Sequence, residues 1–86
     1  MDKLFSDTAW SQLMYWIHEN RKVADKISNL LSDIERNGAG TGIGKPEHLK
    51  YVNGWSRRID QENRLVYRID ENGNLRIISC KGHYDE

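Results

Sequence analysis

The first half of the chain carries two amphipathic segments. One helix face is marked by four apolar residues, Trp10, Leu13, Met14 and Ile17. After a break at residues 19–21, a second stripe follows with Val23, Ile27, Leu30, Leu31 and Ile34. Ser6 or Asp7 is suited to begin the first helix, and Asn37-Gly38 to end the second. This pattern predicts two helices in a hairpin, whose apolar faces need a sheet to cover.

The second half has the pattern of short strands separated by tight turns. Strand-forming residues occupy 55–59, 64–69 and 75–81, and residues 3–6 add a short strand at the N-terminus. A polar turn at 60–63 and an Asn-Gly turn at 72–73 separate the later strands. We therefore expect an α+β fold in the order β-α-α-β-β-β. Two N-terminal helices pack on one face of a mostly antiparallel sheet of four or five strands, and the other face stays open.

The glycine-rich segment 38–44 resembles a nucleotide-binding loop only superficially. A phosphate-binding loop needs Ser or Thr after Gly-Lys, but Pro46 follows Gly44-Lys45. The dinucleotide-binding pattern fails as well, because Ile43 stands where its third glycine belongs. The segment also follows a helix, whereas both motifs follow a strand. We predict a flexible connector between helices and sheet.

Size and composition restrict the class of protein. A chain of 86 residues predicts one domain, residues 1–86, with a thin core. The single cysteine, Cys80, excludes an internal disulfide and is expected to be a buried apolar residue. No apolar run predicts a signal peptide or a membrane span, so we expect a soluble, cytoplasmic protein with no membrane partner. No metal-ligand spacing is present, so no metal and no other cofactor is expected.

Charge is unevenly distributed although the total is zero. Residues 1–42 carry −1, residues 43–68 carry +3 and residues 69–86 carry −2. A concentrated basic segment favours a phosphate-bearing partner, although charges that alternate along solvated strands are an equal alternative.

The residues of this basic segment can support RNA cleavage. That reaction needs a base for the 2′-hydroxyl, an acid for the leaving 5′-oxygen, and fixed cations for the phosphate. Glu47 is the candidate base and His83 the candidate acid. The candidate cations are Lys50, Arg57, Arg58 and Arg64, and Tyr84 can stack on a base or donate to phosphate.

Each assignment has a structural alternative. Glu47 can pair with Lys50, and His83 can be a plain surface residue. Arg64 and Arg68 can pair with Asp60 and Glu62 across the hairpin. The strand register is also open. If Ile59 faces Arg64, Arg57 shares a sheet face with Arg64 and Arg58 lies on the other; a bulge or another loop length reverses this.

Several motifs together carry a family resemblance. They are Gly44-Lys45-Pro46-Glu47-His48-Leu49-Lys50, Gly54-Trp55-Ser56-Arg57-Arg58-Ile59, Arg64-Leu65-Val66-Tyr67 and Cys80-Lys81-Gly82-His83-Tyr84. As a set they resemble the YoeB (Txe) family of bacterial toxins in the RelE/ParE superfamily, across nearly the whole chain. The resemblance implies a RelE-like fold and a toxin that cuts mRNA in the A site of the 70S ribosome.

The resemblance also implies site residues and partners. Glu47 matches the family's general base, His83 its general acid, and Arg64 and Arg58 its phosphate-stabilising arginines, with Lys50 and Tyr84 in supporting positions. A YefM/Axe-like antitoxin neutralises such a toxin, and members can form homodimers. Two other functions remain as alternatives on the same scaffold: a ParE-like toxin that inhibits gyrase, and an RNA-binding module without catalysis.

Overall fold

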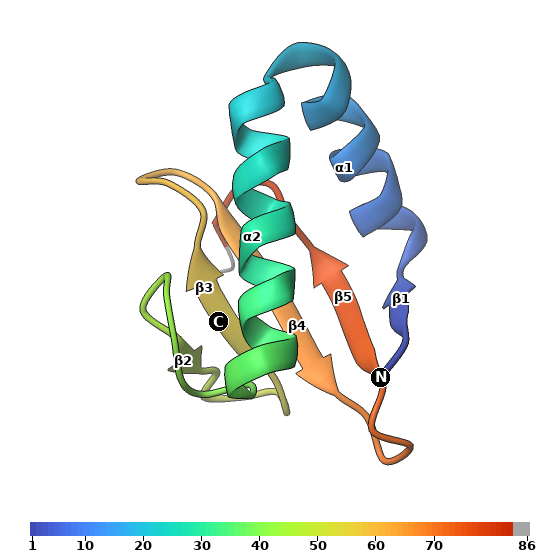
Figure 1. Cartoon of the computed structure of the whole chain (residues 1–86), viewed down its shortest axis with the longest axis vertical. Coiled ribbons are helices and arrows are strands. Elements are labelled where there is room, and N and C mark those ends of the chain that lie inside the picture. Colours follow the sequence, from blue (N-terminus) through green and yellow to red (C-terminus); the bar gives the residue numbers. More distant parts are fainter. Residues whose placement is uncertain (84–86) are drawn as a thin grey trace.

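The computed structural model describes residues 1–83. Within them, two helices cover one face of a five-stranded sheet (Figure 1). In chain order the elements are β1 (Lys3–Phe5), α1 (Asp7–Glu19), α2 (Arg21–Asn37), β2 (Glu47–His48), β3 (Trp55–Arg58), β4 (Arg64–Ile69) and β5 (Leu75–Ser79). The strand order is β1-β5-β4-β3-β2, with β1 parallel to β5 and the other neighbours antiparallel. The predicted α+β class and its mostly antiparallel sheet are confirmed.

The helix ends lie where local chemistry predicts them. Ser6 caps α1, because its side-chain oxygen accepts a hydrogen bond from the Ala9 N–H at 3.0 Å. Asn20 separates the two helices. Gly38 follows α2 with φ of 92° and donates its N–H to the Ile34 carbonyl, as expected for a glycine at a helix C-terminus.

The buried face of α1 keeps only part of the predicted stripe: Leu13 and Ile17 pack against the core, but Trp10 does not. Trp10 is 53% exposed and touches the Phe5 ring edge-on, whereas Ala9 and Trp16 are buried. The Trp16 indole reaches the sheet and donates its Nε1–H to the Cys80 carbonyl at 2.9 Å. The small Ala9 side chain allows α1 to lie close to β5, so the helix turns its Ala9 and Trp16 side inward. The prediction that Trp10 belongs to the core was wrong.

The apolar face of α2 is the predicted one. Ile27, Leu30 and Ile34 are fully buried, with Leu31 beside them. They pack in one cluster with the helix-facing side chains of the two central strands, which are Leu65, Tyr67, Leu75 and Ile77. Cys80 is buried in the same cluster, and burial raises the pKa of its thiol to about 11. The expectation that Cys80 is a buried apolar residue is confirmed.

One strand was absent from the predicted order. β2 contains only Glu47 and His48, and it pairs with β3 at the edge of the sheet. Two residues are too few to show an alternating pattern, which is why the sequence did not reveal this strand. The ring of His48 packs edge-on against Trp55, with ring centres 4.9 Å apart.

Neither α1 nor α2 is long and apolar enough to span a membrane, and residues 1–83 contain no other α-helix.

Candidate functional site

The register between β3 and β4 places two arginines on the same open face. Arg58 lies directly opposite Arg64, and Arg57 lies opposite Leu65. Leu65 is fully buried beneath the helices, so Arg57 shares the helix-facing side and Arg58 and Arg64 face the other way. Of the two registers that the sequence left open, the structure has the one in which Arg58 and Arg64 share a face. The register that pairs Ile59 with Arg64 is shifted from it by one residue.

Glu47 stands on the same open face as these arginines. It pairs with Ser56, and Ser56 pairs in turn with Val66 of β4. Paired residues point to the same side of a sheet, and Ser56 is two residues from Arg58. Glu47 and Arg58 are therefore diagonal neighbours, with Cα atoms about 7–8 Å apart. The exposed Glu47 carboxylate is available at the edge of the sheet.

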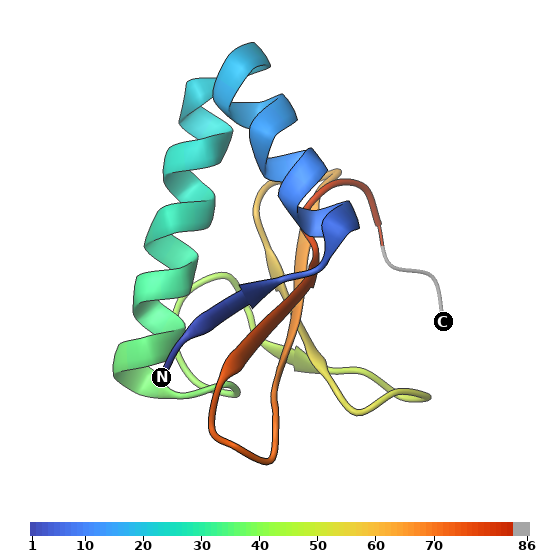
Figure 2. The same cartoon turned by 90° about the vertical axis from the view of Figure 1, so that its right-hand side faces the viewer.

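The backbone after β5 brings His83 next to Arg64. The Arg64 N–H donates to the Gly82 carbonyl at 3.0 Å, and the Gly82 N–H donates to the side-chain oxygen of Asn63 at 2.8 Å. His83 follows Gly82 directly and is exposed. Figure 2 shows residues 80–83, which follow β5, leading away from α2. The backbone at Gly82 is therefore fixed beside the start of β4, one residue before His83.

Arg64 is held in an unusual state. Its Nη1 atom is buried, and no residue within 1–83 accepts a hydrogen bond from it. Among the same residues, neither Arg58 nor Arg64 forms an ion pair. Asp60, the alternative partner across the turn, instead accepts bonds from the Asn63 side chain and the Glu62 N–H. This unsatisfied donor costs stability, because a buried N–H without an acceptor has lost its hydrogen bond to water.

The two remaining candidates stand apart from this arrangement. Lys50 is exposed in the loop that follows β2, and it forms no ion pair with Glu47. Tyr84 lies outside the described residues. Nothing in the sequence pointed to Lys26 of α2, which lies near Arg58 in the fold. Both residues line a hollow of about 370 Å³, together with Gly44, Lys45, Ile59, Asp60 and Gln61. Lys26 carries no local signal, because only the fold brings α2 near the end of β3.

Arg57 is not a substrate-binding residue in this structure. It is completely buried and forms an ion pair with Asp33 of α2. Its Nε–H donates to the Tyr67 hydroxyl at 2.8 Å. Its remaining hydrogen bonds go to carbonyls of the glycine-rich segment, at Gly38 (2.8 Å), Ala39 (3.5 Å), Thr41 (2.8 Å) and Ile43 (3.0 Å). The prediction that Arg57 contacts substrate is corrected, because its guanidinium is buried and all three of its nitrogens donate to groups inside the protein.

The glycine-rich segment is therefore anchored rather than free. Besides its contacts with Arg57, it receives a hydrogen bond from the Tyr67 hydroxyl at the Ala39 carbonyl. Gly42 has φ of 126°, and a Cβ there would lie 1.8 Å from an Asp33 carboxylate oxygen. The Asp33 carboxylate also accepts from the Ile43 N–H at 3.0 Å. The expectation of a flexible connector was wrong, because its glycines let the backbone approach a buried ion pair.

This ion pair predicts a pH dependence of stability. The hydrogen bond from Arg57 and those from Ile43 and Asn37 hold the pKa of Asp33 below its ordinary value of 3.8, against an opposing effect of desolvation. A depressed folded-state pKa stabilises the fold above the unfolded value and loses this contribution as pH falls. In urea unfolding, the stability lost in Asp33→Asn should be largest near pH 6 and shrink below about pH 4. Asp25→Asn, on the exposed side of α2, is the control; an Asp33→Asn effect that is independent of pH would contradict the prediction.

Comparison with known proteins now adds to this geometry. The model of the YoeB-like toxins of bacterial type II toxin–antitoxin systems matches residues 5–84. Toxin YoeB of Escherichia coli K12 is 38% identical over 86 residues, which cover 98% of this chain and 100% of that protein. The chain belongs to the YoeB-like toxin family. It is thus a toxin of a type II toxin–antitoxin system, as the motif resemblance implied.

Solved YoeB structures agree with the fold. The chain is similar to the YoeB dimer from Staphylococcus aureus, with a TM-score of 0.91, 44% identity and 98% of each chain covered. It is also similar to a chain of the heterotetrameric YoeB–YefM toxin–antitoxin complex from the same organism, with a TM-score of 0.89, 45% identity and again 98% of each chain covered.

Proposed function

We propose that this YoeB-like toxin is an endoribonuclease that cuts mRNA in the ribosomal A site, by general acid–base catalysis and without a metal. The observation that carries the proposal is the pair of opposed arginines, Arg58 and Arg64, on the open face of the sheet. Like charges directly opposite each other destabilise a sheet, and no carboxylate in residues 1–83 forms an ion pair with either one. A phosphate between them would offset this repulsion.

The groups beside the arginine pair supply proton transfer. Glu47 removes the proton from the ribose 2′-hydroxyl, and the 2′-oxygen attacks the adjacent phosphorus. The bond from phosphorus to the 5′-oxygen breaks, and His83 protonates that oxygen as it leaves. The products are a 2′,3′-cyclic phosphate and a 5′-hydroxyl. Arg58 and Arg64 bind the non-bridging oxygens, whose negative charge increases in the transition state.

Supporting residues complete the proposed site. Lys50 adds a positive charge from the loop after β2, near the Glu47 edge of the sheet. Tyr84 follows His83 directly and is proposed to stack on a base of the cut codon.

The partners follow from the relatives and from the charge. The Staphylococcus aureus relatives form a dimer and a complex with YefM, so we propose a homodimer and a YefM-like antitoxin for this chain. A net charge of zero disfavours tight binding to free RNA, which depends on many phosphate contacts. We therefore propose that the ribosome positions the mRNA, which places the protein in the cytoplasm.

The test is the pattern of damage after expression is induced in a cell. We expect cuts in mRNA that keep phase with codons, and no cuts in the same transcript when its start codon is removed. Coexpression with the antitoxin should abolish the cuts. DNA breaks with intact mRNA would instead indicate a gyrase inhibitor, and growth arrest with intact RNA and DNA would indicate an RNA-binding module; either result would overturn the proposal.

A further inference from the structure

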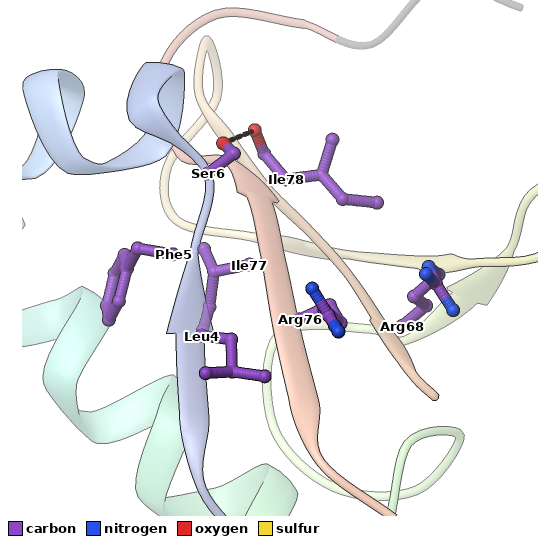
Figure 3. A pocket seen from close by; sticks show the side chains of 7 residues that line it. All are labelled: Leu4, Phe5, Ser6, Arg68, Arg76, Ile77 and Ile78. Atoms are coloured by element: carbon purple, nitrogen blue, oxygen red, sulfur yellow. Dashed lines mark hydrogen bonds between the residues drawn. The ribbon is translucent and has the colours of Figure 1, made fainter. Parts of the chain in front are cut away.

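A second pair of arginines faces each other farther along the open face. Arg68 of β4 lies directly opposite Arg76 of β5. Arg68 is four residues after Arg64 on the same strand, so its side chain points to the same face. Figure 3 shows both side chains on adjacent strands, among the residues that line a pocket, with Leu4 and Ile78. The volume of this hollow is about 170 Å³.

This second pair keeps an uncompensated positive charge. Asp70 forms an ion pair with Arg76 at 2.8 Å, and its carboxylate also accepts from the N–H groups of Asn72 and Asn74. That carboxylate is therefore committed to Arg76 and to the turn between β4 and β5. Within residues 1–83, Arg68 forms no ion pair. Two opposed arginines with a single carboxylate, Asp70, lower the stability of the sheet unless an anion binds beside them.

The distance between the Arg58–Arg64 pair and the Arg68–Arg76 pair is suited to two different anions. Residues four apart on a strand have Cα atoms about 13 Å apart. Side chains that stand roughly perpendicular to a sheet keep this separation, so each pair is placed to bind its own phosphate. They can hold separate phosphates of one strand that runs along β4.

We propose that Arg68, supported by Arg76, binds a second phosphodiester of the RNA strand, distinct from the one that is cut. This inference rests on the proposed function for the identity of the ligand as RNA. The Arg68 guanidinium offers a planar pair of donors suited to phosphate oxygens. Leu4 and Ile78 form an apolar wall of the hollow, against which a ribose can pack.

The dimensions favour RNA over an acidic helix of a partner protein. A hollow of about 170 Å³ accommodates a phosphate and part of a sugar, but not a helix. The positive pairs also continue along one strand, which matches the repeated phosphates of a nucleic acid.

Binding of a short single-stranded RNA tests the proposal directly. The probe is 2′-O-methylated, so that it cannot be cut, and its affinity is measured over a range of salt concentrations. Arg68→Gln should weaken binding several-fold and reduce the slope of log affinity against log salt by about one. Arg68→Lys should keep the slope. Arg36→Gln is the matched control, because Arg36 is exposed on α2, on the helix side of the sheet.

Single methylphosphonates in the probe identify the contacted phosphate. One position other than the scissile one should weaken binding to the unaltered protein and have no effect on Arg68→Gln. The proposal is overturned if the unaltered protein fails to bind at low salt, or if Arg68→Gln matches it in affinity and slope. It is also overturned if Arg68→Gln loses only antitoxin affinity. If RNA binds as expected but is never cut on the ribosome, the proposed function is contradicted and this inference still holds.

Discussion

Replacement of Arg57 by methionine is expected to lower the free energy of unfolding by about 3–5 kcal/mol. The substitution keeps an unbranched side chain but leaves the Asp33 carboxylate without its cation. It also removes the donors to four carbonyls of segment 38–44 and to the Tyr67 hydroxyl. Loss of one partner of a buried pair costs far more than loss of a surface pair, because water cannot replace it. Equilibrium unfolding in urea near pH 7 measures the effect.

The neighbouring residue supplies the control for this experiment. Arg58→Met changes the same chemical group one position along the chain, but Arg58 is exposed and forms no ion pair within residues 1–83. Its effect on unfolding should stay within about 0.5 kcal/mol. An Arg57→Met protein that is as stable as Arg58→Met would show that the buried network does not stabilise the fold.

The Arg57 network also has a consequence for the proposed site. Segment 38–44 leads directly into β2, and its Gly44 carbonyl accepts the Arg58 N–H at 2.7 Å. Arg57 therefore anchors the backbone that leads to Glu47 and borders Arg58. We infer that Arg57 positions this part of the sheet edge without touching RNA.

The contrast between the two helices shows what periodicity can predict. In α2 the apolar residues form one continuous stripe, so only one face can be buried. In α1 the spacing placed Trp10 on the apolar stripe and left Trp16 off it, yet Trp16 is the tryptophan that is buried. The inward position of Trp16 depends on the Cys80 carbonyl, which accepts the indole N–H and lies 64 residues farther along the chain. No local pattern contains that information.

The candidate site was predictable in residue type but not in register. Chemistry and motifs pointed to Glu47, Arg58, Arg64 and His83. The strand register places the first three on one face of the sheet, and the Gly82 carbonyl, one residue before His83, accepts the Arg64 N–H. Arg57 and Arg58 are adjacent and chemically identical, so a one-residue shift exchanges their environments. The carboxylate that draws Arg57 inward is Asp33, which lies in the other half of the chain. Glycine content likewise suggested mobility for segment 38–44, although the same glycines allow tight packing.

The second large effect is expected at Arg64. Arg64→Gln should reduce the single-turnover rate of mRNA cleavage on the ribosome by about 10²- to 10³-fold, because a fixed donor to the transition-state phosphate is lost. The stability of the fold should not decrease. The substitution removes a like charge opposite Arg58 and a buried Nη1 that has no acceptor within residues 1–83. We expect an unfolding free energy equal to or above that of the unaltered protein.

This pairing of lost activity with retained stability separates a catalytic role from a structural one. If Arg64 only supported the sheet, Arg64→Gln would lose stability and activity together. Arg36→Gln is the control, since it removes the same charge from the exposed side of α2 and should cut mRNA at the unaltered rate. Growth arrest on induction gives a second measurement, which Arg64→Gln should abolish and Arg36→Gln should retain. A stable Arg64→Gln protein that cuts at the full rate would contradict the assignment of Arg64 to the scissile phosphate.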